Sequence, residues 1–306
     1  MITTILKKAK LHSDTGGRPP AAVELTPEGA LAAALPGPGQ PPVYAFAPLP
    51  PGALIPGIGE PNVRNPEAVA GAIRSALDSV SPRSRYVTLV LPDPVVRVFV
   101  LDFETLPSKQ AEVLPVLRFR LRKMVPFDVE HTGLSYQILS QKKDEIKVLA
   151  VVLPIAILEE YEAAVEAAGY EAGAVLPSSL ATLEAVDTME AALIANLSGP
   201  ALTTTIANGN DLLLYRTLDL PDDPDMRLAE IQRGVAVAAA YFEDKLGARP
   251  FKLHYAGSGD AHEFGRWLNE PELTVVDLVP QPEVGAATAL ADTSIAGVCG
   301  ALAGVR

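Results

Sequence analysis

The first 66 residues alternate short apolar runs with proline-rich turns. Thirteen of the chain's 28 prolines fall in this stretch. Proline fixes φ and has no N–H to donate, so helices are disfavoured here. Short apolar runs that end at turn sequences such as Thr26-Pro27-Glu28-Gly29 are typical of a meander of strands. The pattern predicts strands at residues 21–25, 30–35 and 43–47.

From residue 65 onward the apolar positions change to helical spacing. Asn65 followed by proline is a typical helix start, and the pattern predicts a helix to residue 80. Two β-branched runs, residues 86–91 and 95–103, then flank Pro92-Asp93-Pro94. This arrangement predicts a hairpin.

A helix is expected over residues 108–127, with Ser108 as its cap. Pro115 should either kink this helix or mark its true start. The pattern then predicts strands at 133–140 and 145–153, a helix at 155–168, a strand at 172–176 and a helix at 178–186.

The second half repeats this order of a strand meander followed by helix–strand units. The expected strands are 192–195, 202–207, 212–218, 252–256 and 272–276, and the expected helices are 227–246, 261–268 and 294–305. Two halves with the same order indicate a duplicated α/β architecture. The run Asp222-Asp223-Pro224-Asp225 is interpreted as a solvated acidic loop.

Composition limits the function. The chain has 306 residues, is 48% hydrophobic and carries a formal charge of −12, which excludes disorder and allows a large core. The negative charge disfavours nucleic-acid binding, because that requires many cationic side chains to displace phosphate counterions. Cys299 is the single cysteine, so neither an intrachain disulfide nor a multi-cysteine metal site is expected.

Targeting signals are not expected. The N-terminal sequence MITTILKKAK places its lysines after the apolar run, the reverse of a secretory signal. No apolar stretch approaches the roughly 18 residues that a membrane span needs. Membrane contact is therefore expected only through a partner, and the expected location is cytoplasmic.

The sequence contains none of the common catalytic or metal-binding motifs. The histidines, at positions 12, 131, 254 and 262, show no paired metal-ligand spacing. No Walker loop, nucleophile elbow or dinucleotide fingerprint is present. We assign no catalytic and no metal-ligating residue, and we interpret Cys299 as an inert core thiol.

Four stretches carry a family resemblance. The most specific is LPSKQAEVLPVLRFRLRKMVPFDVEHTGLSYQIL, with its corner at Val125-Pro126-Phe127. It is followed in order by VVLPIAILEEYEAAVEAAGYEAGAVLPSSLATLEAV, LAEIQRGVAVAAAYFEDKLG and KLHYAGSGD. Together, over roughly residues 20–305, they resemble the PilM-type proteins of type IV pilus assembly. Those proteins belong to the actin-like ATPase superfamily, in the branch that also contains the division protein FtsA.

The resemblance implies a duplicated actin-like, ribonuclease H-like α/β fold with two domains and an inserted α+β subdomain of the FtsA/PilM type. Residues 1–84 and 171–190 would form the first half and residues 85–170 the insert. Residues 191–306 would form the second half, with a reduced helical subdomain at about 221–250.

The resemblance also implies a nucleotide site. In an actin-like site two strand–turn–strand loops approach the phosphates, and a Gly-rich turn accommodates the nucleoside. The matching positions in this sequence are Asn196, Ser198, Gly199, Thr203, Glu230, Arg233, Gly257, Ser258 and Gly259. The implied cofactor is ATP, with Mg²⁺ only as its companion.

The phosphate loops depart from the family pattern. Asn196 stands where the family has an aspartate, so the loop has no charge to attract hydrated Mg²⁺. The first loop contains Pro27, which lacks an N–H donor, between Glu24 and Glu28, whose charges would repel a phosphate. We therefore expect a degenerate site without efficient hydrolysis.

The candidate partner surface is the basic helix of the insert, with Arg118, Phe119 and Arg122. PilM-type proteins hold the cytoplasmic N-terminal tail of PilN, a bitopic inner-membrane protein, in a cleft beside this subdomain. The residues alone leave two interpretations open, a peptide groove and a solvated helix face whose long side chains cover the core.

The resemblance implies a cytoplasmic scaffold of a type IV pilus or related secretion platform. It would be held at the inner membrane through a PilN-like protein and would contact other platform proteins. Two alternatives remain open: an active actin-like ATPase that binds Mg-ATP, and the cytoplasmic L-type component of a type II secretion system.

Overall fold

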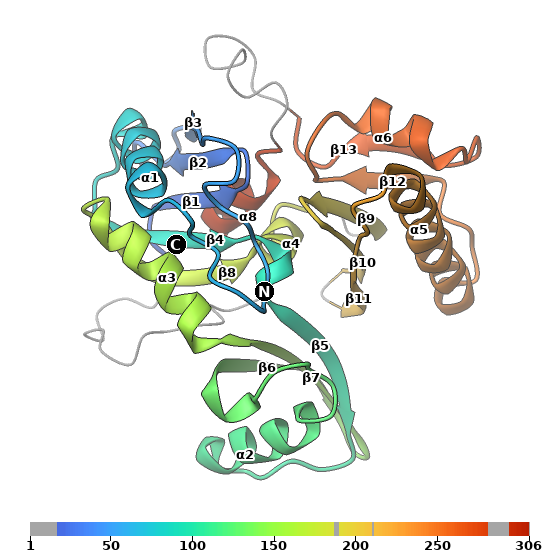
Figure 1. Ribbon diagram of the computed structural model, residues 1–306. Helices are drawn as coiled ribbons and strands as arrows, with labels where there is room; N and C mark the ends of the chain where they lie inside the picture. Colours follow the sequence, from blue (N-terminus) through green and yellow to red (C-terminus); the bar gives the residue numbers. More distant parts are fainter. Residues whose placement is uncertain (1–16, 187–189, 210, 281–293, 306) are drawn as a thin grey trace.

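The described part of the chain forms two five-stranded sheets and a smaller three-stranded sheet (Figure 1). The computed structural model describes residues 17–186, 190–209, 211–280 and 294–305. The N-terminal run MITTILKKAK lies outside these residues. Within them, no helix is both long and apolar enough to cross a membrane.

The first sheet has the strand order β3-β2-β1-β4-β8. Its strands are β1 (Ala21–Thr26), β2 (Gly29–Ala34), β3 (Val43–Pro48), β4 (Tyr86–Leu91) and β8 (Glu171–Pro177). The first three strands are antiparallel, and β4 and β8 continue the sheet in parallel with β1.

The second sheet has the same topology, in the order β11-β10-β9-β12-β13. Its strands are β9 (Ala191–Ser198), β10 (Ala201–Asn208), β11 (Asp211–Asp219), β12 (Lys252–Tyr255) and β13 (Thr274–Asp277). Three antiparallel strands again precede two parallel ones. The repeated topology confirms the predicted duplicated, ribonuclease H-like fold.

Helices cover the first sheet. Helix α1 (Pro66–Val80) starts as predicted, because the Asn65 side chain accepts a hydrogen bond from the Ala68 N–H at 3.1 Å. Helix α1 packs on β2 and β3 and against α3 (Ile155–Ala167). The short α4 (Ser178–Leu183) follows β8 directly.

The C-terminal helix α8 (Ala296–Ala303) returns to the first half, although its place in the sequence put it in the second. It packs against α4 and β1, and its Val298 and Ala301 belong to the core of the first sheet. An apolar helix of small residues fits closely there. A Cβ on Gly300 would overlap the backbone of Ala181.

The insert consists of β5 (Arg97–Phe103), α2 (Gln110–Leu121), the short η2 (Val129–His131), β6 (Thr132–Lys142) and β7 (Glu145–Pro154). Its sheet has the order β5-β7-β6, and α2 buries Val113, Leu117 and Leu121 against it.

The predicted hairpin between residues 86–91 and 95–103 is wrong. Strand β4 pairs with β1 and β8 in the first sheet, whereas β5 pairs with β7 in the insert. The linking residues form a single 3₁₀ turn, η1 (Asp93–Val95). Pro92 and Pro94 cannot donate to a ladder, so they end one strand and redirect the chain into another sheet.

Helix α2 is shorter than predicted and is not capped by Ser108. It begins at Gln110 after Lys109, whose side chain makes no capping hydrogen bond, and it ends at Leu121. Pro115 lies inside the helix rather than at its start.

In the second half, α5 (Pro224–Leu246) and α6 (Ala261–Leu268) cover the sheet. Helix α5 begins three residues before the predicted start. Asp223 accepts from the Met226 N–H at 2.9 Å, and Pro224 takes the first helical position. The acidic run interpreted as a solvated loop therefore contains the cap of α5.

Candidate functional site

The predicted phosphate and nucleoside loops meet in one cleft between the two halves. The cleft is lined from the first half by β1, the β1–β2 turn and Ser178, and from the second half by the end of β9 and the segment after β12. Four of the nine predicted nucleotide-binding residues line it, namely Asn196, Ser198, Gly257 and Ser258.

The cleft is nearly filled by protein. Its cavity measures about 30 Å³, close to the volume of a single water molecule. Pro27 of the first loop packs against Gly199 of the second, with its Cγ 3.4 Å from the position of a Cβ on that glycine. The β1–β2 turn and the β9–β10 turn, which were predicted to hold the phosphates between them, therefore contact each other.

The third loop is attached to the second sheet by backbone bonds. The Ser258 N–H donates to the Leu197 carbonyl at 3.0 Å, and the Ala256 N–H donates to the Ala195 carbonyl at 2.9 Å. A Cβ on Gly257 would lie 2.6 Å from the Leu197 nitrogen. Glycine is therefore needed here for close packing on β9.

A buried network of hydrogen bonds runs beneath the cleft. The Ser178 hydroxyl donates to the Glu24 carboxylate at 2.6 Å, and the Ser179 N–H donates to Asp93 at 3.0 Å. The Ser179 hydroxyl also donates to Asp93. Across the boundary, the Asn196 amide nitrogen lies 3.1 Å from both hydroxyl oxygens. Asn196 thus joins its own half to the first.

Burial controls the charge of this network. It raises the pKa of Glu24 to about 7, and the negative charge of Asp93 acts in the same direction. Burial also raises the pKa of Asp93, against the hydrogen bonds from Ser179. An asparagine between two buried acids donates hydrogen bonds without adding a third charge. The structure thereby gives Asn196 a role that aspartate would perform poorly.

Glu24 approaches the helix that returns from the C-terminus. Its Oε2 has no hydrogen-bond partner among the described residues, and a Cβ on Gly297 of α8 would overlap the carboxylate. Glu24 therefore fills the space beside the α8 N-terminus.

The remaining predicted nucleotide residues do not line the cavity. The Thr203 hydroxyl lies 3.0 Å from that of Thr217 on β11. The Gly199 carbonyl accepts a hydrogen bond from Arg227. Glu230 and Arg233 form an ion pair on one face of α5, and Gly259 has a φ of +81° just before α6.

The three predicted partner residues differ in availability. Arg118 donates to the Val129 carbonyl and to the hydroxyl and carbonyl oxygens of Thr132, so it fastens α2 to the rest of the insert. Arg122 pairs with Glu130 at 2.8 Å on the surface. Phe119 is 75% exposed. Phe119 and Arg122 are accessible, whereas Arg118 is already engaged.

Sequence reasoning missed Ser178 in the lining of the cleft, and Asp93 and Ser179 in the network beneath it. One signal was present, because Asp93 interrupts a long apolar run between two prolines. An acid in that setting is either in a turn or buried with partners. In the structure Asp93 is both: it begins the turn η1, and its carboxylate is buried with Ser179 as partner.

Comparisons with known proteins agree with the topology. No protein-family profile and no curated sequence matches the chain. Its structure is similar to a chain described as the PilM-PilN type IV pilus biogenesis complex. The TM-score is 0.72 at 19% identity, over 94% of this chain and 98% of that one.

A second similar structure is the cytoplasmic domain of EpsL, an inner-membrane component of the type II secretion system of Vibrio cholerae. The TM-score is 0.50 at 15% identity, over 89% of this chain and 92% of that one. Together with the strand orders, these likenesses show a PilM-type actin-like fold.

Proposed function

We propose that this protein is a cytoplasmic scaffold of a type IV pilus or related secretion platform, which binds the N-terminal tail of a PilN-like membrane protein. The observation that carries the proposal is the structural likeness, over 94% of this chain, to a chain of the PilM-PilN complex. The filled cleft supports a scaffold over an ATPase.

Phosphoryl transfer needs charge neutralisation and a cradle of donors around the phosphates. The buried acids in and beneath this cleft are Glu24 and Asp93, and none of the described residues that line the cavity is cationic. Asn196 is occupied by the two serine hydroxyls. Binding of Mg-ATP would require the two halves to separate and the network to break.

The insert offers a surface for the tail. On α2 and the turn after it, Phe119 and Met124 are exposed beside the exposed cations Arg120, Arg122 and Lys123. Apolar anchors flanked by cations suit a peptide that carries apolar and acidic side chains. Each exposed charge pair contributes only about 0–1 kcal/mol, so the apolar anchor should matter most.

Fluorescence anisotropy with a labelled PilN-like tail tests the proposal. We expect Phe119→Ala to weaken binding at least tenfold, and Arg122→Glu to weaken it several-fold at low salt and less at high salt. Phe251→Ala changes a phenylalanine that is 69% exposed in the second half and is the matched control. Lys143→Glu, at the β6–β7 turn, is the charge control.

Unchanged affinity in Phe119→Ala and Arg122→Glu would place the tail elsewhere on the protein. Calorimetry with Mg-ATP is the second arm. We expect no binding in the micromolar range, and tight Mg-dependent binding would favour the ATPase alternative.

The likeness to EpsL supports a second candidate, the L-type component of a type II secretion system. Genome context separates the two. A neighbouring reading frame for a short-tailed, single-span membrane protein supports the pilus scaffold, and neighbouring type II secretion genes support the L-type component.

A further inference from the structure

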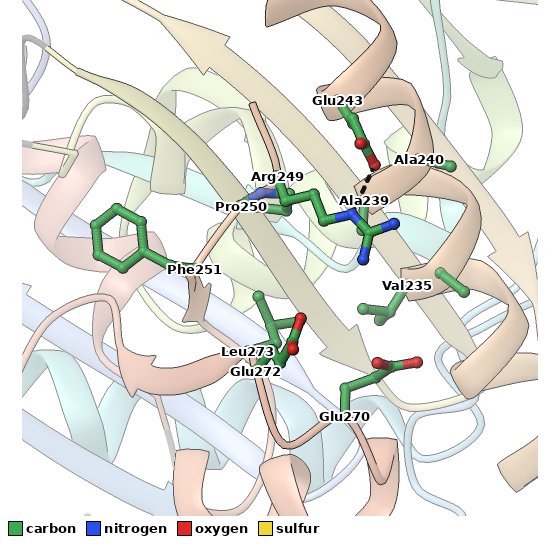
Figure 2. Close-up of a pocket in the computed structure, with 11 residues that line it drawn as sticks. Val235, Ala239, Ala240, Glu243, Arg249, Pro250, Phe251, Glu270, Glu272 and Leu273 are labelled. Atoms are coloured by element: carbon green, nitrogen blue, oxygen red, sulfur yellow. Dashed lines mark hydrogen bonds and ion pairs between the residues drawn. The ribbon is translucent and has the colours of Figure 1, made fainter. Parts of the chain in front are cut away.

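The second half contains a groove that none of the predicted site residues lines. It has a volume of about 450 Å³ and lies between α5, the α5–β12 loop and the α6–β13 loop (Figure 2). That volume is within the range of about 300–1,000 Å³ that is typical of ligand sites.

The floor of the groove is apolar. Val235, Ala236, Ala239 and Ala240 line it from α5, and Leu273 lines it from the opposite loop. Alanines leave a shallow bed that longer aliphatic side chains can fill. Phe251 lies at its edge and is 69% exposed.

The rim of the groove is acidic. It carries Glu243, Glu270 and Glu272 with one cation, Arg249. Arg249 pairs with Glu243 at 3.0 Å. Glu270 and Glu272 are exposed and have no cationic partner in the part of the chain that the structure describes. Two unpaired carboxylates over an apolar bed complement a segment that combines aliphatic and cationic side chains.

The chain itself contains such a segment outside the described residues. Its first twelve residues, MITTILKKAKLH, combine Ile2, Ile5 and Leu6 with Lys7, Lys8 and Lys10 and contain no acidic residue. Such a basic segment is distinctive in a chain of charge −12. Residues 1–16 precede the described part and, fully extended, span about 50 Å.

We propose that this N-terminal segment docks in the acid-rimmed groove of α5, with its aliphatic side chains on the alanine bed and its lysines beside Glu270 and Glu272. The surface is separate from α2, so the inference does not depend on the proposed function.

Site-directed crosslinking in the full chain tests the proposal. In a Cys299→Ser background, Thr4→Cys is combined with Ala240→Cys in the groove and treated with a short bis-maleimide. The matched control combines Thr4→Cys with Val237→Cys. Val237 lies on the same helix and is 46% exposed, but it does not line the groove.

We expect crosslinking at residue 240 to be at least about fivefold faster than at residue 237, and the difference to shrink at high salt. Glu270→Lys with Glu272→Lys should remove the difference. Adding Lys7→Glu, Lys8→Glu and Lys10→Glu to that variant should restore it. An internal product runs as a monomer and an intermolecular one as a dimer, and either product places the segment in the groove.

Equal rates at residues 240 and 237 would overturn the proposal. The proposal would also be overturned if residue 240 were still crosslinked faster than residue 237 in the variant that carries only Glu270→Lys and Glu272→Lys. All substituted positions are exposed or lie in the N-terminal segment, apart from Cys299, so circular dichroism of each variant should match that of the parent.

Discussion

The side-chain nitrogen of Asn196 lies 3.1 Å from the hydroxyl oxygen of Ser178 and donates to it across the boundary between the two halves. Its second donor reaches Ser179 at the same distance. The two serines in turn donate to Glu24 and Asp93. One neutral amide therefore connects β9 to both buried acids of the first half, at the cleft where the predicted phosphate loops meet.

The first prediction is that Asn196→Asp destabilises the protein. The substitution replaces two donors by a carboxylate next to Glu24 and Asp93, and an uncompensated buried charge costs at least about 3 kcal/mol. Because protonation relieves this cost, the loss should be larger at pH 8 than at pH 5. Thermal unfolding at both pH values measures it.

The exposed Asn208 at the end of β10 supplies the control. Asn208→Asp should change stability by no more than about 0.5 kcal/mol. If Asn196→Asp were equally mild at pH 8, the network would not hold the halves together.

The second prediction concerns pH. Glu24 has a folded-state pKa of about 7 against its ordinary value of 4.5, so between these values the folded state binds more protons than the unfolded state. Its contribution to stability is therefore fully present below pH 4.5 and is lost as pH rises to about 7. The loss amounts to at most about 3 kcal/mol.

The test measures the free energy of unfolding of the wild type and of Glu24→Gln by denaturant titration from pH 4.5 to 7.5. The wild-type value should fall as pH rises, and the value for Glu24→Gln should not show this fall. Glu28→Gln, in the exposed β1–β2 turn, should keep it. Parallel curves for wild type and Glu24→Gln would contradict the assignment.

The third prediction tests the close packing at the third loop. A Cβ on Gly257 would lie 2.6 Å from the Leu197 nitrogen, so Gly257→Ala must move the loop away from β9. We expect a loss of at least about 2 kcal/mol. On α1, Gly71→Ala has open space and should stabilise the protein by up to about 1 kcal/mol. Thermal denaturation of the two variants provides the comparison.

The fourth prediction separates a structural arginine from a surface one. Arg118→Ala should lower stability by about 1–3 kcal/mol, because it leaves the Val129 and Thr132 oxygens without their donor. Arg120→Ala, two residues away and exposed, should have an effect within about 0.5 kcal/mol. Equal melting temperatures for the two variants would remove the role given to Arg118.

Local signals in the sequence determined most of the elements. Asn65 before proline located the start of α1 because capping and a fixed φ act within one turn. The repeated order of strands and helices indicated the duplication, and the matching strand orders of the two sheets confirm it. The loops expected to form a nucleotide site do meet in one cleft, with Asn196, Ser198, Gly257 and Ser258 in its lining.

Only the tertiary structure decided what those residues do. The sequence around Pro92-Asp93-Pro94 is compatible with a hairpin, and the choice between pairing β5 with β4 or with β7 depends on partners more than 40 residues away. Arg118 and Arg122 look alike in sequence, yet one is engaged inside the insert and the other lies on its surface. Whether a polar side chain is buried, and with which partners, depends on segments distant in sequence. For that reason the Glu24–Ser178–Asn196 network emerged only when the two halves were brought together.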